Sequence, residues 1–197
     1  MNAPERAFGR IVLPSTSPAP IVWITGLSGT GKTTLANAVC DQLATEGVRA
    51  LLLDGDAVRH ALDSPEDLAR HGYDARVRRA WRLARLARIA ANQGFPVIVA
   101  TISLLHAVQA WNRAGASVYC EVLLSADIDV LKRRDPGLYV HEGADAANVV
   151  GIDIVPEFPL RPELVLEQRF VDSDLPVHAH QVVEQLAALV TPAARRA

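Results

Sequence analysis

The feature that most constrains this chain is a glycine-rich stretch that follows directly on a short apolar run. Residues 21–25 read I-V-W-I-T, and residues 26–34 continue G-L-S-G-T-G-K-T-T. The second segment matches G-x-x-x-x-G-K-[ST], in which backbone N–H groups surround phosphate oxygens at the start of a helix. Apolar residues at helical spacing over 35–43 supply that helix. The sequence therefore predicts a strand, a phosphate-binding loop and a helix, in that order.

The residue types of the loop predict how it holds a nucleoside triphosphate. Lys32 is expected to contact the β- and γ-phosphates as a point charge, and the Thr33 hydroxyl to bind Mg²⁺. A chance match in a turn rich in glycine and threonine is the alternative, but the flanking strand and helix argue against it. ATP and Mg²⁺ are the expected cofactors, and the loop residues predicted to bind ATP are Gly26, Ser28, Gly29, Thr30, Gly31, Lys32, Thr33 and Thr34.

Beyond the loop, apolar runs alternate with helical patterns, which is typical of an α/β fold with a parallel sheet. We expect the phosphate-loop nucleoside triphosphate hydrolase fold, with a sheet flanked by helices in three layers. Further strands are predicted at 49–53, 95–101, 117–124 and 164–166, and further helices at 74–92, 104–113, 127–134 and 177–190.

One domain is predicted over residues 21–191, because a chain of 197 residues is short for two cores. Residues 1–20 are rich in proline and are expected to form a flexible arm, and 192–197 a frayed tail. Residues 134–162 show no clean period and contain recurring glycine and proline. Such a long irregular stretch in a compact domain indicates a functional segment, here a lid.

Composition narrows the class of protein. The net charge of −2 gives no reason to expect nucleic acid or an anionic membrane as a partner. No apolar run approaches about 18 residues and the first residues lack a signal-peptide pattern, so we expect a cytoplasmic protein. Cys40 and Cys120 lie in a predicted helix and a predicted strand and are expected to be buried thiols. The oligomeric state stays open, a homodimer included.

Two carboxylates follow the second predicted strand, in the sequence Asp54-Gly55-Asp56. Ligands of a parallel sheet gather at the carboxyl ends of its strands, so these groups are expected beside the phosphate loop. We predict that Asp54 contacts Mg²⁺ through water and that Asp56 orients or deprotonates an acceptor hydroxyl. A simple D-G-D turn is the alternative. Ser103 follows the third strand and either contacts the substrate or caps the next helix.

Arginines are the predicted contacts for anionic groups. Arg59 lies one helical turn after Asp56, and Arg76 and Arg79 share a face near the start of the long helix. A guanidinium group can hold an anion through two hydrogen bonds, although ordinary surface arginines are the alternative. The later arginines of that helix are expected to form a solvated face: Arg82, Arg85 and Arg88.

Two more arginines, Arg133 and Arg134, stand at the start of the irregular stretch. We predict that they close over ATP and neutralise the charge of the transferred group. A groove for nucleic acid is the competing interpretation of these basic residues. It is disfavoured because aromatic residues do not alternate with the arginines and the overall charge is not basic.

Several motifs in order resemble those of the adenylylsulfate (APS) kinases, which phosphorylate the ribose 3′-hydroxyl of adenylylsulfate with MgATP. The matching segments, spread over about residues 20–190, are 26–34, L-D-G-D-A-V-R at 53–59, G-Y at 72–73, V-I-V-A-T-I-S at 97–103, R-D-P-G-L-Y at 134–139 and N-V-V-G-I-D at 148–153. The resemblance implies that the acceptor nucleotide is contacted by Asp56, Arg59, Tyr73, Arg76, Ile102 and Ser103, and that the lid adds Leu138, Val149 and Val150. It also associates Ser103 with a phosphorylated form.

The chain departs from the family pattern around the acceptor. Arg79 occupies the position of an asparagine, and Val149 that of a phenylalanine which in the family sandwiches the substrate adenine. Loss of one base stack is worth roughly 1–3 kcal/mol, which favours a smaller pyrimidine. Together with A-T-I-S at 100–103, G-Y-D at 72–74, W-N-R at 111–113 and N-V-V-G-I-D at 148–153, these variants resemble the branch that phosphorylates cytidine diphosphoramidate for capsule decoration. We therefore predict that acceptor, with adenylylsulfate in sulfate assimilation as the alternative, and a non-catalytic ATP-binding regulatory module as a further one.

Overall fold

The computed structural model describes residues 17–68, 72–139 and 149–191, and the statements below concern these residues. Most of the predicted arm, the middle of the predicted lid at 140–148 and the tail at 192–197 lie outside them. Within the described residues, no helix has the length and apolar character that a membrane crossing requires.

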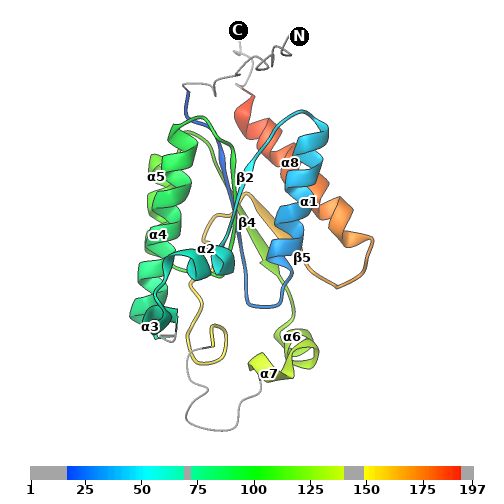
Figure 1. Ribbon diagram of the computed structural model, residues 1–197. Helices are drawn as coiled ribbons and strands as arrows, with labels where there is room; N and C mark the ends of the chain where they lie inside the picture. Colours follow the sequence, from blue (N-terminus) through cyan, green and yellow to red (C-terminus); the bar gives the residue numbers. More distant parts are fainter. Residues whose placement is uncertain (1–16, 69–71, 140–148, 192–197) are drawn as a thin grey trace, which may run out of the picture.

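A parallel sheet of five strands runs through the centre of the molecule in the order β2-β3-β1-β4-β5 (Figure 1). β1 lies in the middle and pairs with both β3 and β4. Because all pairs are parallel, the carboxyl ends of the strands share one edge, which we call the carboxyl edge. The strands are β1 (Ile21–Thr25), β2 (Leu51–Asp54), β3 (Val97–Thr101), β4 (Tyr119–Ser125) and β5 (Leu164–Glu167).

Helices cover both faces of this sheet. α1 (Lys32–Thr45) and α8 (Asp174–Val190) pack together on one face, and α4 (Tyr73–Asn92) and α5 (His106–Gly115) on the other (Figure 1). The remaining short helices lie toward the carboxyl edge: α2 (Gly55–Leu62), α3 (Pro65–Leu68), α6 (Ile128–Arg134) and α7 (Pro136–Tyr139). The predicted three-layer α/β fold is confirmed.

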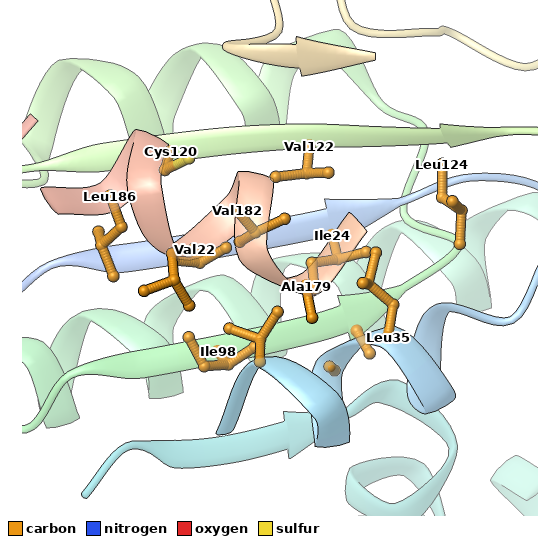
Figure 2. Close-up of a cluster of buried hydrophobic side chains, with 14 of the residues drawn as sticks. Val22, Ile24, Leu35, Ile98, Cys120, Val122, Leu124, Ala179, Val182 and Leu186 are labelled. Atoms are coloured by element: carbon orange, nitrogen blue, oxygen red, sulfur yellow. The ribbon is translucent and has the colours of Figure 1, made fainter. Parts of the chain in front are cut away.

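Alternate residues of β1 supply the two halves of the core. Val22 and Ile24 point toward α1 and α8, where Figure 2 shows them beside Val182 and other apolar side chains. Ile21 and Trp23 point toward α4 and α5. All four are fully buried, and burial of such a side chain is worth about 1.5–3 kcal/mol. The strand that precedes the phosphate loop is thus the best-protected element of the sheet.

Two short helices occupy stretches that the sequence pattern left irregular. In α3 the Ser64 hydroxyl accepts a hydrogen bond from the Asp67 N–H, and proline takes the first helical position. In α7 the Asp135 carboxylate accepts one from the Leu138 N–H. Local capping therefore suffices for one turn of helix, where no periodic pattern can develop.

The cysteines are free thiols with different surroundings. Cys120 is buried as predicted, and burial raises its pKa to about 12. Cys40 is only half-buried, contrary to the expectation, because it lies at the margin of the α1 face. Burial still raises its pKa above the usual range. Neither pKa favours a reactive thiolate at neutral pH.

The predicted solvated arginine face of α4 is wrong for two of its three members. The Arg88 guanidinium lies 4.2 Å from the Trp111 ring centroid and donates to the Trp111 carbonyl at 3.1 Å. Arg82 forms an ion pair with Asp63. Arg85 is exposed as expected. Helical spacing alone missed these contacts because their partners come from α5 and from the end of α2.

Candidate active site

A cavity of about 830 Å³ opens at the carboxyl edge of the sheet. Its volume falls in the range of roughly 300–1,000 Å³ that is usual for small-molecule sites. Its walls come from the phosphate loop, the residues after β2 and β3, the start of α4, the segment 150–157 and the connection from β5 to α8. Residues that are far apart in the sequence therefore meet around one space.

Glycines give the phosphate loop its shape. Gly26 has φ +154°, and a Cβ atom there would lie 2.2 Å from the Leu124 carbonyl oxygen of the neighbouring strand. Gly31 has φ +91° and caps α1. The structure brings all the predicted loop residues to the cavity except Gly26 and Thr30. Thr30 is buried and its hydroxyl donates to the Leu27 carbonyl at 3.0 Å, so these two shape the loop from behind.

Lys32 lies inside the loop as predicted. Its ammonium group donates to the Leu27 carbonyl oxygen at 2.6 Å and lines the cavity. Burial lowers its pKa to about 8, although the nearby carboxylates of Asp56 and Asp54 oppose the shift. The charge is therefore held close to the position where phosphates bind such a loop.

The hydroxyl of Thr33 and the carboxylate of Asp54 lie side by side, as the metal prediction requires. The hydroxyl donates to Asp54 Oδ2 at 2.6 Å, while Oδ1 accepts from the Asp56 and Ala57 N–H groups at 3.0 Å and caps α2. Within the described residues no cluster of three or more His, Cys, Asp or Glu side chains could hold a metal. This sparse oxygen set fits Mg²⁺, which usually keeps waters and binds substrate phosphates.

The part of the cavity predicted to take the acceptor, which we call the acceptor half, is lined by four arginines, which we call the arginine wall: Arg59, Arg76, Arg79 and Arg82. The Arg59 Nη2 donates to the Leu68 carbonyl at 2.7 Å, and its buried Nε makes no hydrogen bond to a described residue. Burial lowers the pKa of Arg76, and the charges of Arg79 and Arg59 lower it further. The guanidinium groups are thus close enough to repel one another, which makes this wall suited to an anion.

The other residues predicted for the acceptor before the lid also line the cavity. Asp56 stands in the first turn of α2, and Tyr73 begins α4 with 53% of its surface exposed. Ile102 and Ser103 follow β3. The Ser103 hydroxyl is buried and has no hydrogen-bond partner in the described part of the chain. Ser103 does not cap the next helix, since the N-cap of α5 is Leu105.

The two arginines predicted to contact ATP behave differently. The Arg134 guanidinium lies 3.9 Å from the Phe170 ring centroid, and both residues line the cavity. Arg133 is exposed and does not reach the cavity. Phe170 was not predicted: it has φ +60°, rare for a residue other than glycine, and such backbone strain clusters at functional sites.

Some of the residues predicted for the lid line the cavity and others do not. Val150 lines the cavity, together with Ile154 and Val155, which were not predicted. Leu138 and Val149 do not line it; they pack against an apolar cluster of Leu27, Leu104, Leu131 and Tyr139, which Val150 contacts as well. Of these two adjacent valines, Val150 therefore lines the cavity and Val149 does not.

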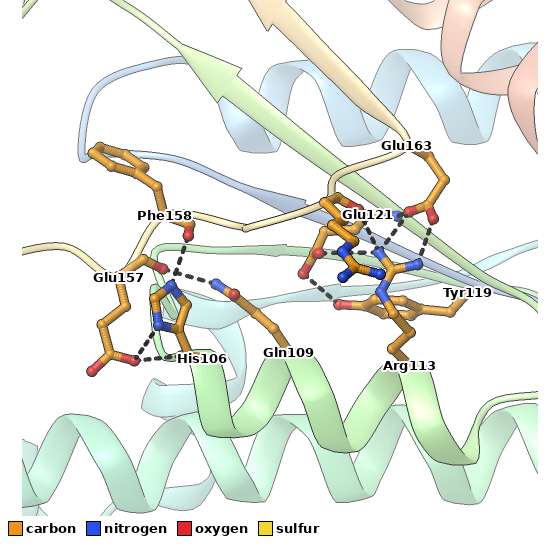
Figure 3. Close-up of polar contacts among 9 residues, drawn as sticks. His106, Gln109, Arg113, Tyr119, Glu121, Glu157, Phe158 and Glu163 are labelled. Carbon is orange, nitrogen blue, oxygen red and sulfur yellow. Dashed lines mark hydrogen bonds and ion pairs between the residues drawn. The ribbon is translucent and has the colours of Figure 1, made fainter.

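Hydrogen bonds and an ion pair attach the segment from Glu157 to Glu163 to side chains of α5 (Figure 3). Gln109 donates to the Glu157 carbonyl at 3.0 Å, and Arg113 Nη1 to Glu163 Oε1 at 2.5 Å. Arg113 also pairs with Glu121, a buried carboxylate whose pKa is raised by burial. Within this network Glu157 lines the cavity and its carbonyl is held by Gln109, whereas Arg113, Glu121 and Glu163 do not line it.

Comparison with known proteins identifies the family. The adenylylsulphate kinase family model matches residues 18–167 of the chain. An adenylyl-sulfate kinase of Aeromonas salmonicida (strain A449) is 41% identical over 152 residues, which cover 74% of this chain and 75% of that relative. One of Vibrio vulnificus (strain YJ016) is 40% identical over 161 residues, covering 80% and 76%. The chain belongs to the adenylylsulphate kinase family.

Solved structures agree with this assignment. The Mycobacterium tuberculosis APS kinase CysC, determined in complex with AMPPNP and APS, is similar with a TM-score of 0.74 and 32% identity. The match covers 87% of this chain and 99% of that one. As a member of the adenylylsulphate kinase family, the protein is a phosphotransferase with an alcohol group as acceptor. The comparisons do not support the predicted cytidine diphosphoramidate branch.

Proposed function

We propose that this protein is an ATP-dependent adenylylsulfate kinase, which phosphorylates the ribose 3′-hydroxyl of adenylylsulfate. The observation that carries the proposal is the single cavity in which the phosphate loop, Asp56 and the arginine wall meet. It joins a site for a triphosphate to a site for an anionic acceptor, as transfer between two nucleotides requires. The adenylyl-sulfate kinases to which the chain is about 40% identical support the same acceptor.

On the ATP side, the loop N–H groups and the Lys32 ammonium bind the phosphates, and Arg134, which stacks on Phe170 and lines the cavity, adds a contact to ATP. Mg²⁺, held by Thr33 and Asp54 with phosphate oxygens and water, would neutralise charge on the β- and γ-phosphates. These residues position the γ-phosphate toward the acceptor half, where Asp56 lines the cavity.

On the acceptor side, the arginine wall binds the anionic group of the nucleotide and thereby places its ribose near Asp56. Asp56 orients the 3′-hydroxyl and accepts its proton. A bond forms between that oxygen and the γ-phosphorus while the bond from the γ-phosphorus to the bridging oxygen breaks, and ADP is released. Positioning and charge neutralisation supply most of the catalysis in such a reaction.

Cytidine diphosphoramidate is the second candidate acceptor. It stays a candidate because Arg79, which stands where the family pattern has asparagine, changes the wall of the acceptor half. The stacking argument for a pyrimidine depended on Val149, which does not line the cavity. That argument therefore no longer favours cytidine over adenine.

Release of ADP, measured with each acceptor side by side, tests the proposal. We expect a higher kcat/KM with adenylylsulfate. A higher value with cytidine diphosphoramidate would overturn the choice of acceptor but leave the kinase assignment intact. Tight ATP binding with no ADP formed from either acceptor, or from a wider nucleotide panel, would favour a regulatory ATP-binding module.

A further inference from the structure

A carboxylate with almost no exposed surface lies among the residues of the arginine wall and lines the cavity with them. Asp63 follows the last residue of α2, and only 2% of its side chain is exposed. Its Oδ2 accepts a hydrogen bond from Arg79 Nε at 2.6 Å, and its Oδ1 accepts one from Arg82 Nη1. Arg79 and Arg82 are one turn apart on α4, and both line the cavity. One carboxylate therefore connects the end of α2 to two cavity-lining guanidinium groups.

Asp63 is ionised in this setting. Burial raises its pKa, but the hydrogen bonds and charges of Arg79 and Arg82 outweigh that effect, and the net pKa lies below the usual range. A buried ion pair gives little net stability compared with apolar residues of similar size. A gain in protein stability is thus a weak explanation for Asp63. Its effect on the orientation of Arg79 and Arg82 is a stronger one, because a planar guanidinium group is fixed when its N–H groups are bound.

Backbone carbonyls of α3 also fix two arginines of the wall. Arg79 also donates to the Asp67 carbonyl, and Arg59 to the carbonyl of Leu68 in the same short helix. Asp63 is one carboxylate among the four arginines of the wall, so this part of the cavity lining keeps an excess of positive charge after the pairing. Preset donors lower the ordering cost of binding a ligand.

We propose that Asp63 is a positioning residue for the acceptor: it fixes Arg79 and Arg82 so that the anionic group of the substrate meets guanidinium groups already in place. Asp63 acts through these two arginines and takes no part in phosphoryl transfer. The inference rests on the proposed function in one respect, namely that the acceptor is an anionic nucleotide bound in this half of the cavity.

The kinetic test is Asp63→Asn, which keeps the volume and removes the charge. We expect the KM for the acceptor to rise about 10-fold, the loss typical of a charge-assisted hydrogen bond, while the KM for ATP changes less than about twofold. Asp63→Glu, which restores the charge, should recover part of the acceptor affinity. An unchanged acceptor KM in Asp63→Asn, or an equal rise in both KM values, would overturn the proposal.

The matched control is Glu121→Gln. Glu121 is also buried and paired with an arginine, and it accepts a hydrogen bond from the Tyr119 hydroxyl at 3.0 Å, but it does not line the cavity. We expect this variant to lose thermal stability without raising the acceptor KM relative to the ATP KM. A selective rise in the acceptor KM as large as that of Asp63→Asn would show a general effect of destabilisation and overturn the proposal.

A measurement without any substrate separates this inference from the proposed function. In ¹⁵N-labelled protein, the Arg79 Nε proton should exchange with water much more slowly than that of exposed Arg85, and Asp63→Asn should abolish the difference. Arg79→Lys assigns the signal. Equal exchange in the unmodified protein overturns the inference. Failure to use adenylylsulfate overturns the proposed function, and the KM comparison is then made with the acceptor that is used.

Discussion

The two halves of the cavity are built in different ways. The half proposed to bind ATP, here the ATP half, is formed mainly by the backbone of one continuous loop between β1 and α1, where glycine conformations decide the shape. The acceptor half is formed by side chains of α2, α4 and segment 150–157, and ion pairs such as Asp63–Arg79 decide its shape. A continuous motif fixes its own geometry, whereas a wall of charges depends on partners from elsewhere in the fold. Substitutions in the two halves should therefore have separable effects.

The largest effect is expected in the ATP half, from Lys32→Ala. Loss of the ammonium group from the loop should lower kcat by about 10²–10³-fold or more, because a fixed charge that stabilises the transferred group is removed. Release of ADP with a saturating acceptor measures it. Lys132→Ala removes the other lysine, whose ammonium pairs with Asp129 on α6 and does not line the cavity, and should retain full activity. Full activity of Lys32→Ala would show that the loop is wrongly assigned.

Asp56→Asn should have the next largest effect, at the junction of the two halves. We expect kcat to fall about 10²–10⁴-fold, because the variant cannot accept the proton of the acceptor hydroxyl. The KM for each substrate should change little, as measured by initial rates at varied ATP and acceptor. If the acceptor KM rises instead while kcat is kept, Asp56 binds the acceptor without taking its proton.

Phe170→Leu tests the ATP half with a moderate effect. It removes the ring beneath the Arg134 guanidinium, and a contact of this kind is worth about 0.5–2 kcal/mol. The KM for ATP should therefore rise about 2- to 30-fold, with the acceptor KM unchanged. Titration of the protein with a non-hydrolysable ATP analogue checks the same loss directly. A rise in the acceptor KM alone would show that Phe170 belongs to the acceptor half and not to the ATP half.

The smallest effect is expected from a pair of neighbouring substitutions in the acceptor half. Val150→Phe adds a ring to the cavity wall and should lower the KM for adenylylsulfate a few-fold through base stacking. Val149→Phe adds the same ring to the apolar cluster around Leu27, where overpacking is expected to lower the melting temperature instead. A lower KM for adenylylsulfate in Val149→Phe would show that position 149 contacts the base of the acceptor.

The sequence sufficed to predict the sheet, its main helices and the phosphate loop, because each depends on a local pattern. The boundaries of β1 are those that its apolar run indicates. Asp54 could be placed beside Thr33 because parallel strands share a carboxyl edge, although the two residues are 21 positions apart. Regular periodicity and a motif with a physical reason thus carry over into the structure.

The details of the acceptor half could not be predicted in this way. Asp63 lies 16 and 19 residues from its two arginines, and the pairing depends on how the connection between α2 and α4 folds. Val149 and Val150 are adjacent valines, and the backbone that turns at Gly151, with φ +94°, decides which one faces the cavity. The positive φ of Phe170 has no sequence signal, since that conformation is rare for aromatic residues.

The strand order has a consequence for how such a protein can change during evolution. β2 and β3, which precede the arginine wall, lie on one side of β1, and β4 and β5, which flank segment 150–157 and lead to Arg134 and Phe170, lie on the other. Mutations that reshape the acceptor side leave the middle strand and its loop untouched. In a protein with this topology, single substitutions can therefore change the acceptor specificity during evolution while the phosphate loop and its nucleotide stay the same.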